Sequence, residues 1–279
     1  MTGAVEWVES HRTRLALHAW VPERPRGIAF YVHGIQSHAG WLFETGPFLR
    51  GQGVGVYALD RRGSGRSEGP RGEVPSLQVL LDDYAAAFER VRRLHPDRPL
   101  ALVGQSLGGA IAAGLAAEGR VRPDAIALCA PALAQQRAKL SEAEREAIRK
   151  DRSRAPAPLA LRDEDYTRAP AFLEFIRTDP LVLRAVGNLT RATLLDLEDY
   201  YLSLPNGWPR SPTALVLPRR DAIIRLAAAR EAFLALTSGR GMILELPADE
   251  HYLEFSEHRD AFRTWLAGFV ATSGYGLRP

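Results

Sequence analysis

Through its first half, the chain alternates short apolar runs with segments of helical periodicity. Residues 27–32 (GIAFYV) form a continuous apolar run, which is typical of a strand buried on both faces of a sheet. Residues 75–94 place apolar side chains at helical spacing behind a proline, which predicts a helix. Because strands that alternate with helices build parallel βαβ units, the pattern predicts an α/β fold with a mostly parallel sheet flanked by helices. The segments expected in this region are strands at 15–21, 27–32, 53–59, 99–103 and 124–129 and helices at 75–94 and 107–118.

This alternation stops after Pro131 and resumes near residue 212. Between these points the chain contains no strand-like run, and helical patterns take its place until turn-forming residues at 205–212 (PNGWPRSP). The sequence therefore predicts a core domain formed by residues 1–131 and 212–279, interrupted by a mainly helical insert at 132–211. The helices expected in the insert are 141–150, 168–177, 180–188 and 190–204, and beyond it we expect strands at 213–217 and 241–246 and helices at 225–236 and 259–270.

The composition excludes several classes of protein. Hydrophobic residues make up 46% of the 279 residues and charged residues 25%, which excludes intrinsic disorder as the main state. The single cysteine, Cys129, excludes a disulfide framework and a cysteine-built zinc site. The net charge is +3, and the many arginines are interleaved with Asp and Glu, so we expect no nucleic-acid partner.

The sequence also predicts neither a transmembrane segment nor a secretory signal. No apolar run approaches the roughly 18 residues that are needed to span a bilayer. Residues 1–20 carry charges throughout and lack the apolar stretch of a secretory signal. We therefore expect a cytoplasmic protein without a transmembrane segment, for which peripheral contact with a membrane stays open.

A G-x-S-x-G motif at residues 104–108 directly follows the strand expected at 99–103 and opens the helix expected at 107–118. A nucleophile elbow needs this strand–turn–helix setting, because the sharp turn exposes the serine hydroxyl at the edge of the sheet. The glycines leave room for a backbone geometry that larger side chains would obstruct. We therefore predict that Ser106 is a catalytic nucleophile; the alternative is an ordinary glycine-rich turn.

A serine nucleophile needs a base and a carboxylate that orients the base. Asp221 lies four residues after the strand expected at 213–217, and His251 lies five residues after the strand expected at 241–246. Both positions fall in loops at the carboxyl edge of the sheet, where the active sites of open α/β sheets collect. We predict that Asp221 and His251 form a catalytic triad with Ser106. Alternatively, Asp221 caps a turn or helix and His251 is an ordinary loop histidine.

Acyl transfer also needs two hydrogen-bond donors for the oxyanion. One predicted donor is the backbone N–H of Leu107, the residue after the nucleophile. The other is the backbone N–H of Ile35, in the loop after the strand at 27–32, where Gly34 permits a tight turn. His33 precedes the serine in the chain and leads into this donor loop, so we interpret it as a hydrogen-bonding residue that shapes the loop.

These motifs, together with the loop DRRGSGRS at residues 60–67, resemble those of the α/β-hydrolase superfamily, and within it the monoacylglycerol lipase and lysophospholipase-like group. The resemblance covers most of residues 28–131 and 212–270. It implies an eight-stranded, mostly parallel sheet flanked by helices, with a helical cap (lid) inserted after the sixth strand, which corresponds to residues 132–211. It also implies a nucleophile at Ser106, an acid at Asp221 and a base at His251, with the oxyanion donors already named.

The expected reaction is hydrolysis of a carboxylic ester in a small or lipid-like substrate, such as a monoacylglycerol or lysophospholipid. It proceeds through an acyl-enzyme on Ser106 and requires no metal or organic cofactor. A biosynthetic thioesterase, a lactonase and a C–C bond hydrolase would use the same triad and remain alternatives. A non-catalytic receptor or scaffold is a further alternative. The sequence predicts no oligomeric state.

Apolar side chains of the insert and of the loop after the strand at 27–32 are candidates for an acyl pocket, because ligand sites are mostly apolar. Charged residues of the insert, among them Arg184 and Asp199, would instead suit a polar or anionic substrate. The candidate substrate-binding residues are His38, Trp41, Phe172, Phe175, Ile176 and Tyr201.

Overall fold

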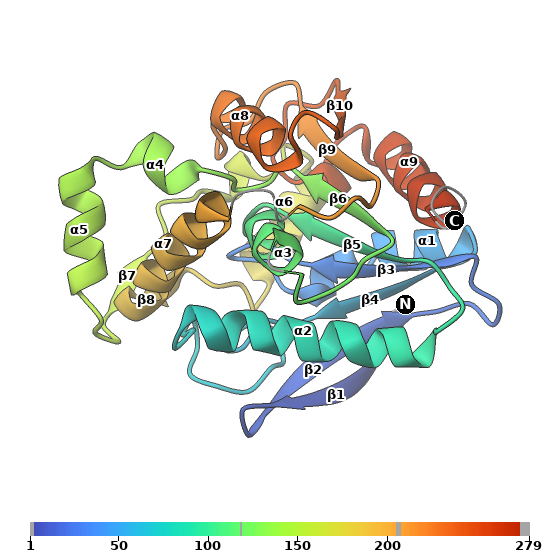
Figure 1. Cartoon of the computed structure of the whole chain (residues 1–279), viewed down its shortest axis with the longest axis horizontal. Coiled ribbons are helices and arrows are strands. Elements are labelled where there is room, and N and C mark those ends of the chain that lie inside the picture. Colours follow the sequence, from blue (N-terminus) through green and yellow to red (C-terminus); the bar gives the residue numbers. More distant parts are fainter. Residues whose placement is uncertain (1–2, 118, 205–207, 274–279) are drawn as a thin grey trace.

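The structure is a computed structural model that describes residues 3–117, 119–204 and 208–273. Its centre is an eight-stranded sheet with the order β1-β2-β4-β3-β5-β6-β9-β10 (Figure 1). β2 runs antiparallel to β1 and to β4, and the remaining neighbours are parallel. The strands are β1 (Ala4–Ser10), β2 (Thr13–Trp20), β3 (Gly27–Val32), β4 (Val54–Leu59), β5 (Leu100–Gln105), β6 (Ala125–Cys129), β9 (Thr213–Pro218) and β10 (Met242–Leu246).

Helices cover both faces of this sheet, which explains why strands such as β3 are apolar along their whole length. Along β3, Phe30 packs with the side chains of α2 and α3, and Tyr31 packs on the opposite face with those of α1 and α9. Both faces of β3 are fully buried, as its apolar sequence predicts. The helices of the core are α1 (Thr45–Gly51), α2 (Leu77–Leu94), α3 (Leu107–Ala117), α8 (Leu226–Thr237) and α9 (Arg259–Thr272).

The insert lies between β6 and β9, and its described residues, 132–204 and 208–211, project beyond one end of the sheet (Figure 1). It carries the helices α4 (Gln135–Lys139), α5 (Glu142–Lys150), α6 (Pro170–Thr178) and α7 (Asn188–Ser203). It also contains a small antiparallel sheet of β7 (Pro156–Pro158) and β8 (Ala185–Gly187). Of the turn segment expected at 205–212, residues 205–207 lie outside the described residues.

Two expectations for the insert are therefore wrong: that it contains no strand, and that residues 180–188 are helical. Strands of three residues are too short to show a periodicity, and two prolines in β7 weaken its strand signal further. After α6, the Leu181 N–H bonds to the Asp179 carboxylate and the Leu183 N–H bonds to the Gln36 carbonyl. These two N–H groups therefore donate to acceptors outside the i→i−4 hydrogen-bond pattern of a helix.

The edge strand β1 was also not expected from the sequence.

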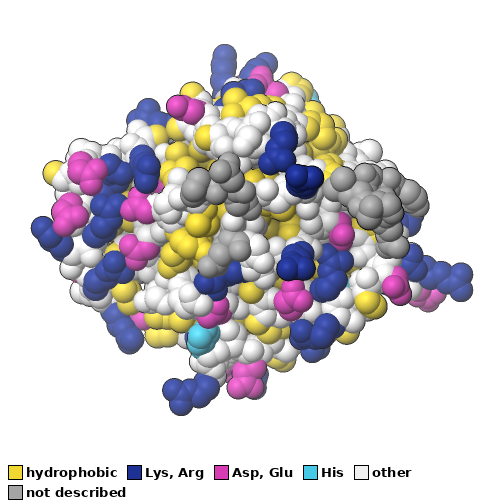
Figure 2. All heavy atoms as spheres, viewed as in Figure 1, with side chains coloured by type: hydrophobic (Ala, Val, Ile, Leu, Met, Phe, Trp, Pro, Cys, Tyr) yellow, Lys and Arg dark blue, Asp and Glu magenta, His cyan; other side chains and the backbone are white. Residues whose placement is uncertain are grey.

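The surface carries both signs of charge. On the face shown in Figure 2, Lys and Arg side chains are interspersed with Asp and Glu. In the insert, Asp199 pairs with Arg137 and Arg149, and Arg184 pairs with Asp163. Both charged residues named for an anionic substrate, Arg184 and Asp199, are thus engaged in ion pairs within the insert. Among the described residues, no helix has the length and apolar character that are needed to cross a membrane.

Candidate active site

Ser106 lies in the turn between β5 and α3 with a φ of +54°, a left-handed conformation that is rare for residues other than glycine. Hydrogen bonds hold it there on both sides. Its N–H donates to the Cys129 carbonyl at 3.0 Å, and its own carbonyl accepts from the N–H groups of Gly109 at 2.9 Å and Ala132 at 2.8 Å. The surrounding strands and helix therefore impose the strained geometry that a nucleophile elbow requires, and this turn is called the elbow below.

The glycines of the motif are required by close backbone contacts. A Cβ at Gly108 would lie 1.9 Å from the Val32 carbonyl oxygen, and one at Gly104 would lie 2.4 Å from the Gly108 oxygen. Neither contact can be relieved by moving a flexible side chain. The two glycines allow α3 to pack directly against β3 and β5, which places Ser106 at the carboxyl edge of the sheet.

Replacing Gly108 by alanine is expected to lower the free energy of unfolding by about 3 kcal/mol, because the helix must move away from β3 to make room. Gly268→Ala is the matched control, since a Cβ there meets no atom within 4 Å in the middle of α9. This control is expected to raise stability by about 0.5–1 kcal/mol. Urea unfolding of both variants measures the difference. Equal stability of the two would contradict the close-packing argument.

Asp221 and His251 lie in the loops after the adjacent parallel strands β9 and β10. The Nδ1 of His251 lies 2.8 Å from Oδ2 of Asp221, and both side chains are fully buried. The other oxygen of Asp221, Oδ1, accepts from the N–H groups of Ile223 at 2.7 Å and Ile224 at 2.8 Å. Asp221 thus caps a turn and also contacts His251, so the capping contact does not exclude the contact that a triad requires.

The Nε2 edge of His251 faces the elbow. The side-chain nitrogen of Gln105, the residue before Ser106, lies 3.3 Å from this Nε2. With Nδ1 donating to Asp221, Nε2 is unprotonated and accepts from the Gln105 amide. In the described part of the chain, Ser106 Oγ makes no hydrogen bond to His251. Sequence reasoning missed Gln105, whose place beside the serine in the G-x-S-x-G motif was the available signal.

The loop after β3 is fixed through its backbone carbonyls. Arg61, which is buried, donates to the carbonyls of Gly34 at 2.9 Å and Ile35 at 2.8 Å. The next three carbonyls, those of residues 36–38, also accept hydrogen bonds. Within the described residues, by contrast, the N–H groups of Ile35 and Leu107 have no acceptor. Gly34 lies against the elbow, because a Cβ there would come within 3.4 Å of the Ser106 Cβ. Two free donors therefore belong to the segments that flank the serine.

His33 supports this loop, in agreement with its interpretation from the sequence. Its Nδ1 donates to the Gly34 carbonyl at 2.8 Å and its Nε2 accepts from the Arg61 N–H at 2.9 Å. Burial and the nearby Arg61 guanidinium lower the pKa of His33 to about 3. The ring is therefore neutral and fully engaged, which leaves it no lone pair for proton transfer.

The loop at residues 60–67 also has a supporting role. The Asp60 carboxylate accepts from the N–H groups of Ala39 at 2.7 Å and Arg66 at 2.8 Å, and from His18 Nε2 at 2.9 Å. These contacts join the β4 end to the loop after β3. Among the described residues, no group of three or more His, Cys, Asp or Glu side chains could hold a metal ion.

The candidate substrate-binding residues occupy three different environments. Four of them belong to one aromatic cluster, defined by Trp41, Phe43, Tyr166, Phe172, Phe175, Ile176, Tyr252 and Phe255. The Tyr166 ring packs edge-on against His251 with a centroid distance of 5.7 Å, so this cluster borders the site. Tyr201 is buried elsewhere and accepts from the Ala134 N–H, and His38 contacts Asp179. Their contact with substrate stays a prediction.

Comparisons with known proteins agree with this architecture. A family model described as serine aminopeptidase, S33, matches residues 23–255. A monoglyceride lipase of Mus musculus is 37% identical over 100 residues, which are 36% of this chain and 33% of that protein. A monoacylglycerol lipase of Mycolicibacterium smegmatis is 32% identical over 121 residues, or 43% of each chain. The chain thus spans less than half of the length of these curated relatives.

The crystal structure of a monoacylglycerol lipase from Paleococcus ferrophilus superposes with a TM-score of 0.80 at 22% identity, over 93% of this chain and 99% of that one. This likeness confirms the fold expected from the sequence. The family match extends from before β3 to beyond His251 and so includes the elbow, the insert and both loops of the Asp221–His251 pair. The chain therefore belongs to the serine aminopeptidase S33 family of α/β-hydrolases.

Proposed function

We propose that this protein hydrolyses carboxylic esters by acyl transfer through Ser106. The observation that carries the proposal is the buried Asp221–His251 pair, with 2.8 Å between Oδ2 and Nδ1, whose Nε2 edge faces the strained turn that holds Ser106. A serine, a histidine and a carboxylate arranged in this order are what nucleophilic acyl transfer requires. A binding protein has no need of all three.

In the proposed mechanism, the Ser106 hydroxyl attacks the ester carbonyl while His251 Nε2 accepts its proton. Asp221 keeps the remaining ring proton on Nδ1 and stabilises the imidazolium that forms. The N–H groups of Ile35 and Leu107 bind the oxyanion, and each donor of this kind is worth about 3 kcal/mol in the transition state. His251 then protonates the leaving alcohol, and a water molecule, activated by the same ring, releases the acid.

The hydrogen bond between Ser106 and His251 has to form during this reaction. Catalytic hydrogen bonds are often long in substrate-free structures and tighten in the complex. Gln105 Nε2 now contacts the ring atom that would accept the serine proton. Rotation of the Ser106 hydroxyl towards Nε2, with Gln105 moving aside, would complete the triad.

The insert is proposed to act as the cap over this site and to form a domain of its own, with residues 1–131 and 212–279 as the core. It contacts the loop after β3 through the Leu183 N–H, which donates to the Gln36 carbonyl, and it contacts the segment after His251. The Tyr252 N–H donates to the Tyr166 carbonyl at 3.1 Å, and Thr167 Oγ1 donates to the Phe255 carbonyl at 2.9 Å. The aromatic cluster lies between these contacts and provides an apolar surface beside His251.

The proposed substrates are monoacylglycerols or lysophospholipid-like esters, because relatives named as a monoglyceride lipase and a monoacylglycerol lipase match part of this sequence and the cap is apolar near His251. Contact with lipid at a membrane surface and a cytoplasmic location belong to the same proposal. Thioester, lactone and C–C substrates use the same chemistry at Ser106 and differ in the leaving group. The choice among them depends on the substrate series below.

Initial rates on p-nitrophenyl esters from acetate to palmitate are expected to show an optimum at medium or long acyl chains. Each methylene that enters an apolar pocket contributes about 0.8 kcal/mol, so kcat/KM is expected to rise roughly 4-fold per methylene until the pocket is full. The Ser106→Ala variant measures the rate of hydrolysis that does not depend on this serine. A flat profile would contradict a defined acyl pocket. Labelling of Ser106 by a fluorophosphonate without turnover of any ester would instead favour a lactone, thioester or C–C substrate.

A further inference from the structure

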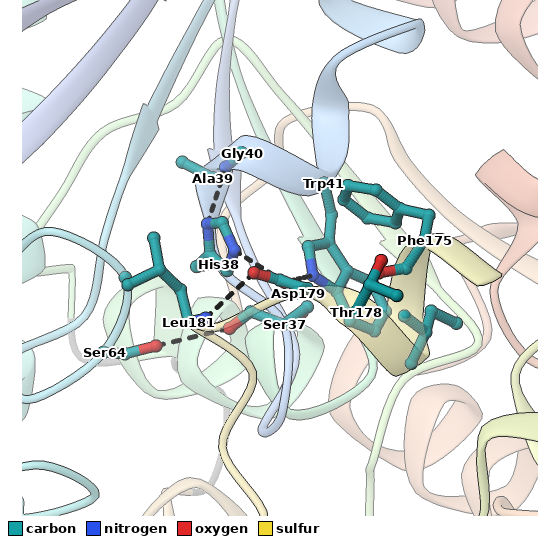
Figure 3. A network of polar contacts seen from close by, with 12 residues as sticks. Ser37, His38, Ala39, Gly40, Trp41, Ser64, Phe175, Thr178, Asp179 and Leu181 are labelled. Atoms are coloured by element: carbon teal, nitrogen blue, oxygen red, sulfur yellow. Dashed lines mark hydrogen bonds and ion pairs between the residues drawn. The ribbon is translucent and has the colours of Figure 1, made fainter. Parts of the chain in front are cut away.

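Asp179 directly follows α6 in the insert, and its carboxylate binds donors from a distant part of the chain (Figure 3). Oδ2 accepts from His38 Nε2 at 2.9 Å and from Trp41 Nε1 at 2.8 Å. Oδ1 accepts from the Leu181 N–H at 2.9 Å. The side chain is only 6% exposed. Burial alone would raise the pKa of Asp179, but the hydrogen bonds from His38 and its neighbours outweigh burial and hold the pKa below its ordinary value.

The geometry at His38 defines the direction of its hydrogen bond. Its Nδ1 accepts from the Gly40 N–H at 3.1 Å, so the ring proton is on Nε2 and points at Asp179. All three groups around Asp179 are therefore donors, and both carboxylate oxygens are used as acceptors. A charged carboxylate satisfies this arrangement, whereas a side chain of the same shape with its own N–H groups would place a donor against a donor.

Asp179 does not act alone in joining the insert to the loop after β3. Four residues further on, the Leu183 N–H donates to the Gln36 carbonyl at 3.0 Å. Between them, the Leu181 carbonyl accepts from Arg71 Nη2 at 2.7 Å. The segment 179–183 therefore holds the loop at Gln36, His38 and Trp41, which follow Ile35 closely in the chain.

We propose that Asp179 is a positioning residue that fixes the loop at residues 33–41 and, through it, the Ile35 N–H in the oxyanion hole. The role of the Ile35 N–H rests on the proposed function, and the coupling of insert to loop rests on the hydrogen bonds just described. The insert then contributes to the rate of the chemical step and not only to the binding of substrate. A displacement of about 1 Å in a positioned catalytic group costs as much as about 100-fold in rate.

Asp179→Asn tests this coupling with little change in shape. Wild-type protein and the variant are compared for kcat and KM on a p-nitrophenyl ester and for affinity to an alkyl trifluoromethyl ketone, which forms an oxyanion adduct with a serine. We expect kcat to fall about 10- to 100-fold with KM changed less than about threefold, and the ketone to bind more weakly by a similar factor. Hydrogen exchange in peptides covering residues 33–42 is expected to be faster by about fivefold or more.

Asp163→Asn is the matched control, because Asp163 is an insert carboxylate that pairs with Arg184 within the insert. It is expected to leave kcat and the exchange of residues 33–42 unchanged. His38→Leu serves as a second variant should Asp179→Asn fail to fold, since the leucine side chain has no N–H to donate to Asp179 and the substitution leaves the Trp41 and Leu181 contacts in place.

Two results would overturn the proposal. The first is unchanged exchange of residues 33–42 in a folded Asp179→Asn protein. The second is a loss of kcat in both Asp179→Asn and the Asp163→Asn control, in each case in proportion to the fall in melting temperature. Asp179 would then contribute only to stability. Failure of the proposed function is a separate outcome, recognised when Ser106→Ala and wild type hydrolyse esters equally. The exchange measurement decides the coupling in that case too.

Discussion

Replacing Ser106 by alanine is expected to lower kcat/KM for ester hydrolysis by about 10³- to 10⁶-fold, because the acyl-enzyme can no longer form. The fold is expected to persist. Alanine and serine have similar costs at a φ of +54°, and the backbone hydrogen bonds of residue 106 do not use its side chain. The expected melting temperature is within about 2 °C of the wild-type value.

The control for this variant is Ser273→Ala, which removes another buried serine hydroxyl that bonds to the Val270 carbonyl at the end of α9. It is expected to keep full activity and to remain labelled by a fluorophosphonate probe. The Ser106→Ala protein is expected to lose the label. Near-full turnover or unchanged labelling in Ser106→Ala would remove this serine from its proposed role.

Local patterns explain why much of the core and the candidate triad could be predicted. The turn at Ser106 depends in part on contacts between near neighbours, such as the one with the Gly108 carbonyl that excludes a side chain at Gly104. Asp221 and His251 could be placed because each follows an apolar strand, and parallel strands bring their carboxyl ends to one edge. In each case a short stretch of sequence contains the whole signal.

The contacts of the insert could not be predicted in the same way. Asp179 binds His38, which lies 141 positions away in the chain, and no local sequence pattern predicts that contact. Likewise, the sequence shows that Trp41 and Phe172 are apolar, but an apolar side chain can line a pocket or fill a core. In the structure both are buried in the aromatic cluster. Tertiary packing decides between these possibilities, and it involves partners from three separate parts of the chain.

Asp221→Asn is expected to lower kcat by about 10⁴-fold while KM changes little. The reason lies in the second oxygen of Asp221, which accepts from the N–H groups of Ile223 and Ile224. In the variant these two donors hold the amide oxygen in that position, so the amide nitrogen must face Nδ1 of His251. Nδ1 then becomes an acceptor and the ring proton moves to Nε2, the atom that has to take the proton from Ser106.

The neighbouring carboxylate provides the control for this tautomer argument. Asp249 is two residues from His251 and binds the Arg219 guanidinium at 2.9 Å. Asp249→Asn is expected to keep kcat within about threefold of the wild-type value, since exposed ion pairs contribute little. An Asp221→Asn protein that retains more than about a tenth of wild-type kcat would contradict the role of Asp221 as the residue that orients His251. A large loss in Asp249→Asn alone would transfer that role to Asp249.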